Sequence, residues 1–139
     1  MADPFDIERF VEAQAPVYGK VHRELAAGRK ESHWMWFIFP QIAGLGQSAM
    51  SIRFAIASLD EAKAYLAHPV LGPRLREVAK LVLEAEARTA RQIFGAIDEM
   101  KFRSSMTLFA QAAPDEQVFQ GCLDKYFAGS PDPATLARL

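Results

Sequence analysis

The sequence predicts one all-α domain of about seven helices, covering residues 1–139, with an aromatic segment at its centre. Three observations predict this fold class. Helix-capping and helix-ending residues recur along the chain, the apolar residues between them repeat at helical spacing, and the hairpin dipeptides Asn-Gly and Asp-Gly are absent. A chain of 139 residues that is 50% hydrophobic is also large enough to bury a core without disulfides.

The N-terminal part predicts two helices, at residues 7–14 and 16–27. Asp6 is placed to cap the first helix, because its carboxylate can accept from a free backbone amide. Pro16 suits the first turn of the second helix and breaks the chain before it. Gly28 is a plausible left-handed residue after the last turn.

Residues 34–39 form the most apolar segment and contain both tryptophans of the chain. Their composition fits a buried helix or a buried strand equally well. Because no partner strand is predicted elsewhere, we expect a buried helix that Ser32 caps and Pro40 ends.

The rest of the chain alternates loops and helices. Residues 42–51 predict an irregular loop, since Gly44 and Gly46 lower helical preference. Ser58 and Glu61 have the spacing of a capping box. Further helices are predicted at residues 59–67, 69–87, 89–94, 98–112 (capped by Asp98) and 114–127, with a last turn at 133–139.

Composition narrows the function classes. The formal net charge is −1, whereas a general nucleic-acid binder would show a clear basic excess. The single cysteine, Cys122, excludes an intrachain disulfide and a cysteine-built zinc site. The three histidines are not spaced as metal ligands, so we expect no metal and no cofactor. No signal peptide or membrane-spanning run is visible, which predicts a soluble cytoplasmic protein.

Four segments, taken in order, resemble a bacterial family catalogued as domain of unknown function 1810. They are residues 28–41 (GRKESHWMWFIFPQ), 44–46 (GLG), 68–72 (HPVLG) and 101–109 (KFRSSMTLF). The resemblance extends from residue 5 to residue 136. It implies an all-helical single domain and supplies no established activity.

Members of this family are often given the name calpastatin, which conflicts with the composition of this chain. A calpain inhibitor of that kind is an extended, largely disordered chain that folds on its protease. This chain contains ten phenylalanines and is half hydrophobic. We therefore expect it to fold alone and disregard the name.

A cationic turn precedes the aromatic segment. Arg29 and Lys30 lie next to Ser32 and His33 at a predicted helix start. Free amides at a helix start, together with two cations, would form a pocket for phosphate or carboxylate. The alternative is a solvated turn beside an ordinary core.

The polar residues of the aromatic segment are further candidates. His33 shares a predicted helix face with Trp36, and Gln41 closes the segment. A neutral His33 could accept a proton or bind a ligand, and an indole can stack on a flat ring. The alternative is that His33 is bonded to a backbone group at the edge of the core.

The second cluster lies on the predicted helix 98–112. Asp98, Lys101 and Ser105 form one stripe, opposite an apolar face. A desolvated Lys101 could act as a base for the Ser105 hydroxyl, although this spacing is common in helices. Ligand contact by the same stripe is the simpler interpretation.

Together these residues predict a domain that binds a small anionic or nucleotide-like ligand. The catalytic candidates, for a metal-independent transfer or hydrolysis, are His33, Asp98, Lys101 and Ser105. The competing hypothesis is a non-enzymatic interaction module in which the same residues are structural. A third, weak nucleic-acid binding through Arg29 and Lys30, predicts steep salt dependence. The proposed ligand pocket consists of Arg29, Lys30, His33, Trp36, Gln41, Lys101 and Ser105.

Overall fold

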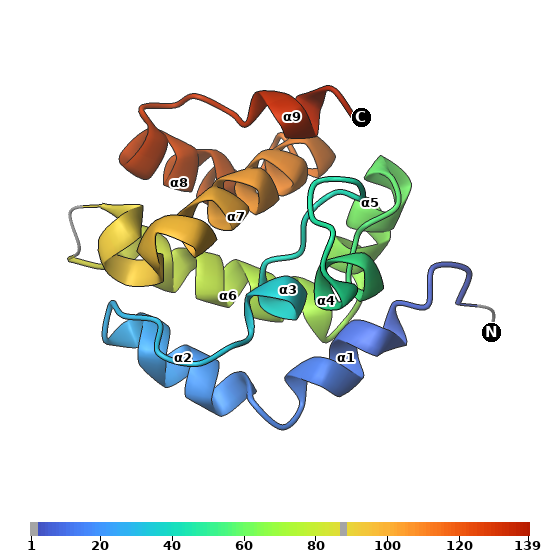
Figure 1. Ribbon diagram of the computed structural model, residues 1–139, viewed down its shortest axis with the longest axis horizontal. Helices are drawn as coiled ribbons and strands as arrows, with labels where there is room; N and C mark the ends of the chain where they lie inside the picture. The colour runs from blue at the N-terminus through green and yellow to red at the C-terminus, as the bar shows by residue number, and fades with distance from the viewer. Residues whose placement is uncertain (1–2, 87–88) are drawn as a thin grey trace.

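The computed structural model describes residues 3–86 and 89–139, which form nine helices and no strand (Figure 1). The all-α class is therefore confirmed, with more helices than the seven or so expected. The helices are α1 (Glu8–Gln14), α2 (Tyr18–Ala26), α3 (Met35–Ile38), α4 (Ala49–Arg53), α5 (Leu59–Ala67), α6 (Leu71–Glu84), α7 (Ala90–Ala112), α8 (Gln117–Phe127) and α9 (Pro133–Leu136).

Helices α6 and α7 cross the middle of the molecule, and α8 packs against both (Figure 1). Helices α6 and α8 run in the same direction. Arg76 near the start of α6 pairs with Glu116 just before α8, and the Tyr126 hydroxyl near the end of α8 donates to the Val82 carbonyl near the end of α6. Helix α7 packs against α8 and also against α5. Helix α2 also packs against α6, and α1 packs against α3.

The aromatic segment lies in the core, as predicted. Phe39 is fully buried, and its ring centroid lies 5.0 Å from that of Phe102, 5.8 Å from that of Phe94 and 6.2 Å from that of Trp34. Only Met35–Ile38 is helical, so the segment is a single turn rather than the expected helix over 34–39. It is held by tertiary contacts, because one isolated turn has little stability of its own.

The chain leaves the aromatic segment as an extended loop. Ile42 forms an isolated parallel bridge with Ile56. In it the Ile56 amide donates to the Gln41 carbonyl and the Ala43 amide donates to the Ile56 carbonyl, both at 2.8 Å. This pairing fixes the backbone of Gln41 beside the core.

Three predicted caps are wrong. Asp6 has a left-handed φ of 52°, and the Asp3 carboxylate instead accepts from the amides of Ile7 and Glu8, at 2.9 and 3.1 Å. Ser32 binds a distant carboxylate, and Asp98 lies inside α7. Each residue type suits a cap, but the path of the neighbouring chain decides which carboxylate or hydroxyl reaches the amides.

Helix boundaries differ from the prediction in several places, among them α2 and α8, which begin at Tyr18 and Gln117 rather than at positions 16 and 114. Helix α4 falls where a loop was expected, with Ser48 as its cap. The break predicted after residue 94 is confirmed, because the backbone of α7 is not helical at Gly95 (φ 85°, ψ 169°), but the helix resumes before Asp98 rather than at it. Helix α6 ends at Glu84, and the predicted end at Ala87 lies outside the described residues. Gly28, with a φ of 74°, follows α2 as predicted.

Candidate functional site

The segment KFRSSMTLF on α7 mainly holds the C-terminal part of the chain. Arg103 donates to the carbonyls of Ser130 and Pro131, at 3.0 and 3.1 Å. The Ser104 hydroxyl donates to the Asp132 carboxylate at 2.9 Å. These bonds fasten α9 to α7, which gives most polar residues of the segment a structural role.

Ser105 is fully buried, and its Oγ has no hydrogen-bond partner among the described residues. Lys101 does not bond to it; the Lys101 ammonium lies instead near Asp98 and Trp36. Ser105 therefore lies beneath the surface, where no substrate reaches its hydroxyl in this conformation. The predicted pairing of Lys101 as base with Ser105 as nucleophile has no contact to support it.

A buried carboxylate organises the cationic turn. Glu24 of α2 is 7% exposed and accepts from the backbone amides of Glu31 and Ser32, at 2.7 and 3.0 Å. It also accepts from the Ser32 hydroxyl at 2.6 Å and from Nε1 of Trp34 at 3.0 Å. The amides expected to bind an external anion are thus occupied by Glu24. The sequence gives little signal for this role, because a glutamate on an amphipathic helix is usually solvated.

Glu24 is adapted to be ionised in the fold. Burial alone would raise its pKa, but the hydrogen bonds from Ser32, the two amides and Trp34 outweigh burial and lower the pKa from 4.5 to about 2. A charged carboxylate is therefore the form that holds this turn at neutral pH.

Lys30 and Lys101 meet at a single carboxylate, that of Asp98. Nζ of Lys30 lies 3.0 Å from Oδ2 of Asp98, and Nζ of Lys101 lies 3.5 Å from Oδ1. The exposed fractions of the three side chains are 8% for Lys30, 19% for Asp98 and 24% for Lys101. The structure thus joins two candidate segments that are far apart in the sequence.

Each lysine also lies over an indole ring. Nζ of Lys30 is 5.1 Å from the ring centroid of Trp34, and Nζ of Lys101 is 5.5 Å from that of Trp36. Such cation–π contacts contribute about 0.5–2 kcal/mol, with larger values where water is excluded. Trp34 is 1% exposed and belongs to the core, whereas Trp36 is only partly buried.

His33 is exposed and Gln41 is partly exposed. Among the described residues, neither side chain has a hydrogen-bond partner, although both flank the turn that carries Trp36. The alternative in which the His33 side chain forms a hydrogen bond with a backbone group is therefore not seen among the described residues. Both side chains are free to contact a ligand.

Arg29 lies apart from this cluster. It lines a separate hollow of about 350 Å³ over α2, together with Lys20 and Arg23. In the part of the chain that the structure describes, no hydrogen bond, ion pair or cation–π contact joins Arg29 to Trp36 or Lys101. The predicted pocket therefore divides, with Arg29 on one side of the turn and Lys30 on the other.

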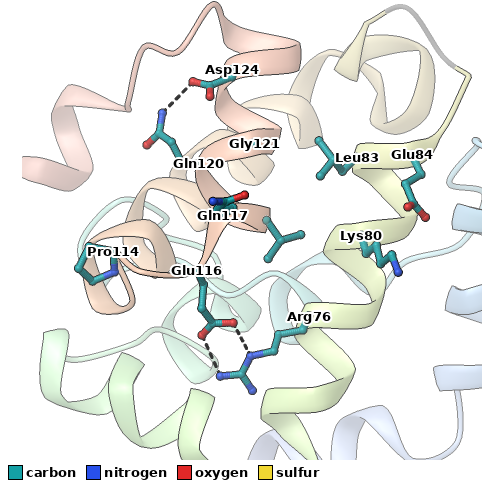
Figure 2. Close-up of a pocket in the computed structure, with 11 residues that line it drawn as sticks. Arg76, Lys80, Leu83, Glu84, Pro114, Glu116, Gln117, Gln120, Gly121 and Asp124 are labelled. Atoms are coloured by element: carbon teal, nitrogen blue, oxygen red, sulfur yellow. Dashed lines mark hydrogen bonds and ion pairs between the residues drawn. The ribbon is translucent and has the colours of Figure 1, made fainter.

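A larger hollow, of about 840 Å³, lies between α6 and α8, away from the aromatic segment (Figure 2). Gly121 leaves room there, since a Cβ at this position would lie 3.3 Å from Leu83. The Arg76–Glu116 ion pair closes one end (Figure 2). The glycine in the middle of α8 is the one sequence signal for this groove, which was not among the predicted sites.

The other reactive side chains are isolated. Cys122 is buried, which raises the pKa of its thiol to about 12, and its Sγ donates to the Ala79 carbonyl at 3.5 Å. Within residues 3–86 and 89–139, no cluster of three or more His, Cys, Asp or Glu is arranged to hold a metal ion. In the same part of the chain, no helix has both the length and the apolarity needed to cross a membrane.

Comparison with known proteins places the chain in a family. The sequence model of the family described as "Protein of unknown function (DUF1810)" matches residues 4–139. The chain belongs to this family. The resemblance identified from the four segments is thereby confirmed, but the family description assigns no activity to this DUF1810 domain.

A solved structure supports the same assignment. The crystal structure of the conserved hypothetical protein Rv1873 from Mycobacterium tuberculosis is 54% identical to this chain, with a TM-score of 0.97. The match covers 99% of this chain and 98% of that one. No curated protein matches this DUF1810 domain.

Proposed function

We propose that this domain binds a small anionic ligand of nucleotide-like shape at the surface formed by Lys30, Trp36 and Lys101. One observation carries the proposal: two ammonium groups converge on one place, each lying over an indole ring. His33 and Gln41, which have free side chains at the edge of this surface, would contact the body of the ligand.

The electrostatics favour an anion. The side chain of Lys30 is 8% exposed, so its ammonium group is largely removed from water. Charges interact more strongly where water is excluded. The two lysines and Asp98 together carry a formal charge of +1, which a single anionic group would neutralise.

The shape of the site favours a ligand with a flat ring. Trp36 is the tryptophan that remains partly exposed, and an indole face can stack on a base or another planar group. If the ligand is a substrate, Asp98 and His33 are the groups placed to transfer a proton without a metal. Ser105 is too deeply buried to take part.

The competing function, a protein-interaction module, has an observation of its own. Ile97 and Met100, on the same helix as Lys101, are 76% and 66% exposed. Exposed apolar side chains of this size can mark a surface that contacts another protein. Under this hypothesis Trp36 and Lys101 would be structural.

The experiment is calorimetric titration with AMP and with inorganic phosphate, on the wild type, K101Q and H33A. We expect both variants to lose at least about tenfold in AMP affinity while their Tm values stay close to that of the wild type, since a partly exposed ion pair contributes about 0–1 kcal/mol. K63Q, which removes an exposed lysine on α5, is the control and should bind AMP normally.

Two results would contradict the proposal. One is the absence of AMP and phosphate binding to the wild type at millimolar concentrations. The other is a large loss of Tm in K101Q or H33A with unchanged AMP affinity, which would assign these residues to the fold and support the interaction module.

A further inference from the structure

The Asp98 carboxylate bridges the two lysines with one oxygen each. Oδ2 faces Lys30 at 3.0 Å and Oδ1 faces Lys101 at 3.5 Å. A carboxylate or a phosphate of a ligand can present two oxygens in the same way. The two lysines are therefore spaced to bind an anion through two of its oxygens. In this structure the carboxylate of Asp98 is that anion.

Asp98 is held differently from the buried or partly buried acidic side chains of Glu24, Glu61 and Asp132. Glu24 accepts from two backbone amides, Glu61 from the Ala57 amide and Asp132 from the Thr135 amide. In the described part of the chain, Asp98 accepts no hydrogen bond from backbone or from any neutral side chain; its partners are the two ammonium groups. Rotating its side chain away would break no backbone interaction.

The two lysines, in contrast, are positioned independently of Asp98. The Lys30 amide donates to the Ile93 carbonyl at 2.8 Å, which fixes its backbone against α7. Nζ of Lys30 lies over Trp34, and Nζ of Lys101 lies over Trp36. The cationic half of the site thus stays in place when its carboxylate is removed or turned away.

We infer that Lys30 and Lys101 form a binding site for an oxyanion and that Asp98 fills this site until a ligand displaces it. The ligand is then a planar ring that bears a carboxylate or a phosphate, with the ring on Trp36 and the anionic group in place of the Asp98 carboxylate. This inference rests on the proposed function, because it names the chemical group that the ligand brings to that surface.

The test is chemical rescue of D98A. Removing the carboxylate leaves the partly buried Lys30 without a counter-ion, so D98A should melt at a lower temperature than the wild type. Sodium formate, acetate or phosphate should restore most of the lost Tm, and sodium chloride at equal ionic strength should not. The wild type should respond little, because its own carboxylate fills the site.

E99A is the matched control. Glu99 is the next residue of α7, its side chain is also 19% exposed, and it pairs with the single guanidinium of Arg91. An ion pair with one exposed cation provides no site that an anion could bridge. Formate should therefore raise the Tm of E99A no more than chloride does. Rescue of E99A equal to that of D98A would overturn the inference.

The second measurement is AMP affinity. Since D98A and D98N remove the internal competitor, both should bind AMP about tenfold more tightly than the wild type. D98N preserves the volume of the side chain and serves if D98A does not fold.

These outcomes separate the two proposals. If the wild type binds AMP and the Asp98 variants bind it equally or more weakly, the inference fails and the proposed function stands. If formate rescues D98A but AMP does not bind the wild type, the oxyanion site of Lys30 and Lys101 stands, while the proposed function and the planar-ring ligand fail. If AMP does not bind the wild type and formate does not rescue D98A, both proposals are overturned.

Discussion

At the scale of single residues, Glu24 has the largest influence on the candidate site. Its carboxylate accepts four hydrogen bonds from the turn that carries Lys30 and Trp34. No local rule predicts this, because the donors follow the end of α2 and reach back to it. The residue types of the turn were recognised as functional candidates, while the acid that positions them was not.

The variant E24Q tests this role. Glutamine keeps the size of the side chain but cannot accept from all four donors, so buried donors are left unsatisfied. We expect a loss of about 3 kcal/mol in the free energy of unfolding, measured by urea denaturation. An E12Q control, at an exposed position of α1, should lose almost nothing. A loss in E24Q as small as that in E12Q would contradict this account.

The same residue predicts a pH dependence. The folded-state pKa of Glu24, about 2, is lower than its ordinary value of 4.5. Its contribution to stability is therefore fully present above pH 4.5 and is lost as the pH falls from 4.5 towards 2. The free energy of unfolding of the wild type should fall more steeply over this window than that of E24Q. Parallel curves would contradict the assignment.

At the scale of secondary-structure elements, the kink in α7 decides where the site forms. Gly95 adopts a φ of 85° and a ψ of 169°, a conformation that residues with a Cβ rarely adopt. Before the kink, the Ile93 carbonyl accepts from Lys30, and after it Asp98 contacts Lys30. The sequence indicated a glycine break here, but the direction in which the helix resumes depends on the core beneath it.

We expect G95A to lose about 1–3 kcal/mol in the free energy of unfolding, because alanine is strained in this conformation. Crowding cannot explain such a loss, since a Cβ at Gly95 would meet no atom within 4 Å. G19A is the control, and we expect it to increase the free energy of unfolding. Gly19 lies inside α2 with only the Arg23 side chain nearby, so alanine should stabilise the helix. Urea denaturation of both variants measures the effect. A neutral G95A would show that the kink is not imposed by the backbone.

At the scale of the whole molecule, one hydrophobic core includes buried residues of every helix from α1 to α8 except α4, whose Met50 packs against it. Rings of the aromatic segment connect its parts: Phe37 packs on Phe54 and Phe39 on Phe102. No set of helices therefore has a core of its own. The aromatic segment contributes little helix but connects the surrounding elements.

A shared core predicts cooperative unfolding. Thermal melts followed by far-UV circular dichroism and by tryptophan fluorescence should coincide, since both tryptophans lie in the central segment. Calorimetry should give a heat-capacity change of about 2 kcal/mol/K for a chain of this length. Separate transitions for the two probes would show that the aromatic segment and the outer helices unfold independently.

The fold class was predictable because it rests on local signals. Helical spacing, the Ser58 cap and the glycine at position 28 act through neighbouring residues, and the structure contains the corresponding helices. Boundaries were less predictable where two nearby acids could both cap a helix, as at α1, where Asp3 rather than Asp6 accepts from the free amides. Helix α4 was missed because its glycine-rich approach lowers local helical preference.

The candidate site was predicted only in part. The pairing of the cationic turn with α7 was expected, and Lys30, Trp36 and Lys101 do come together. Arg29 lies elsewhere, because consecutive residues of an extended turn face different surroundings. Ser105 is buried although it is one helical turn from Lys101, because the neighbouring helices cover this end of the stripe.

The sequence by itself determined that this chain folds as helices around an aromatic centre, because capping, spacing and hydrophobicity act over a few residues. The tertiary structure alone decided which charges meet. It turned Glu24 inward onto the cationic turn, brought Lys30 and Lys101 to the two sides of Asp98 and left Trp36 at the surface. Such contacts depend on how the whole core packs, which no segment of the chain specifies alone.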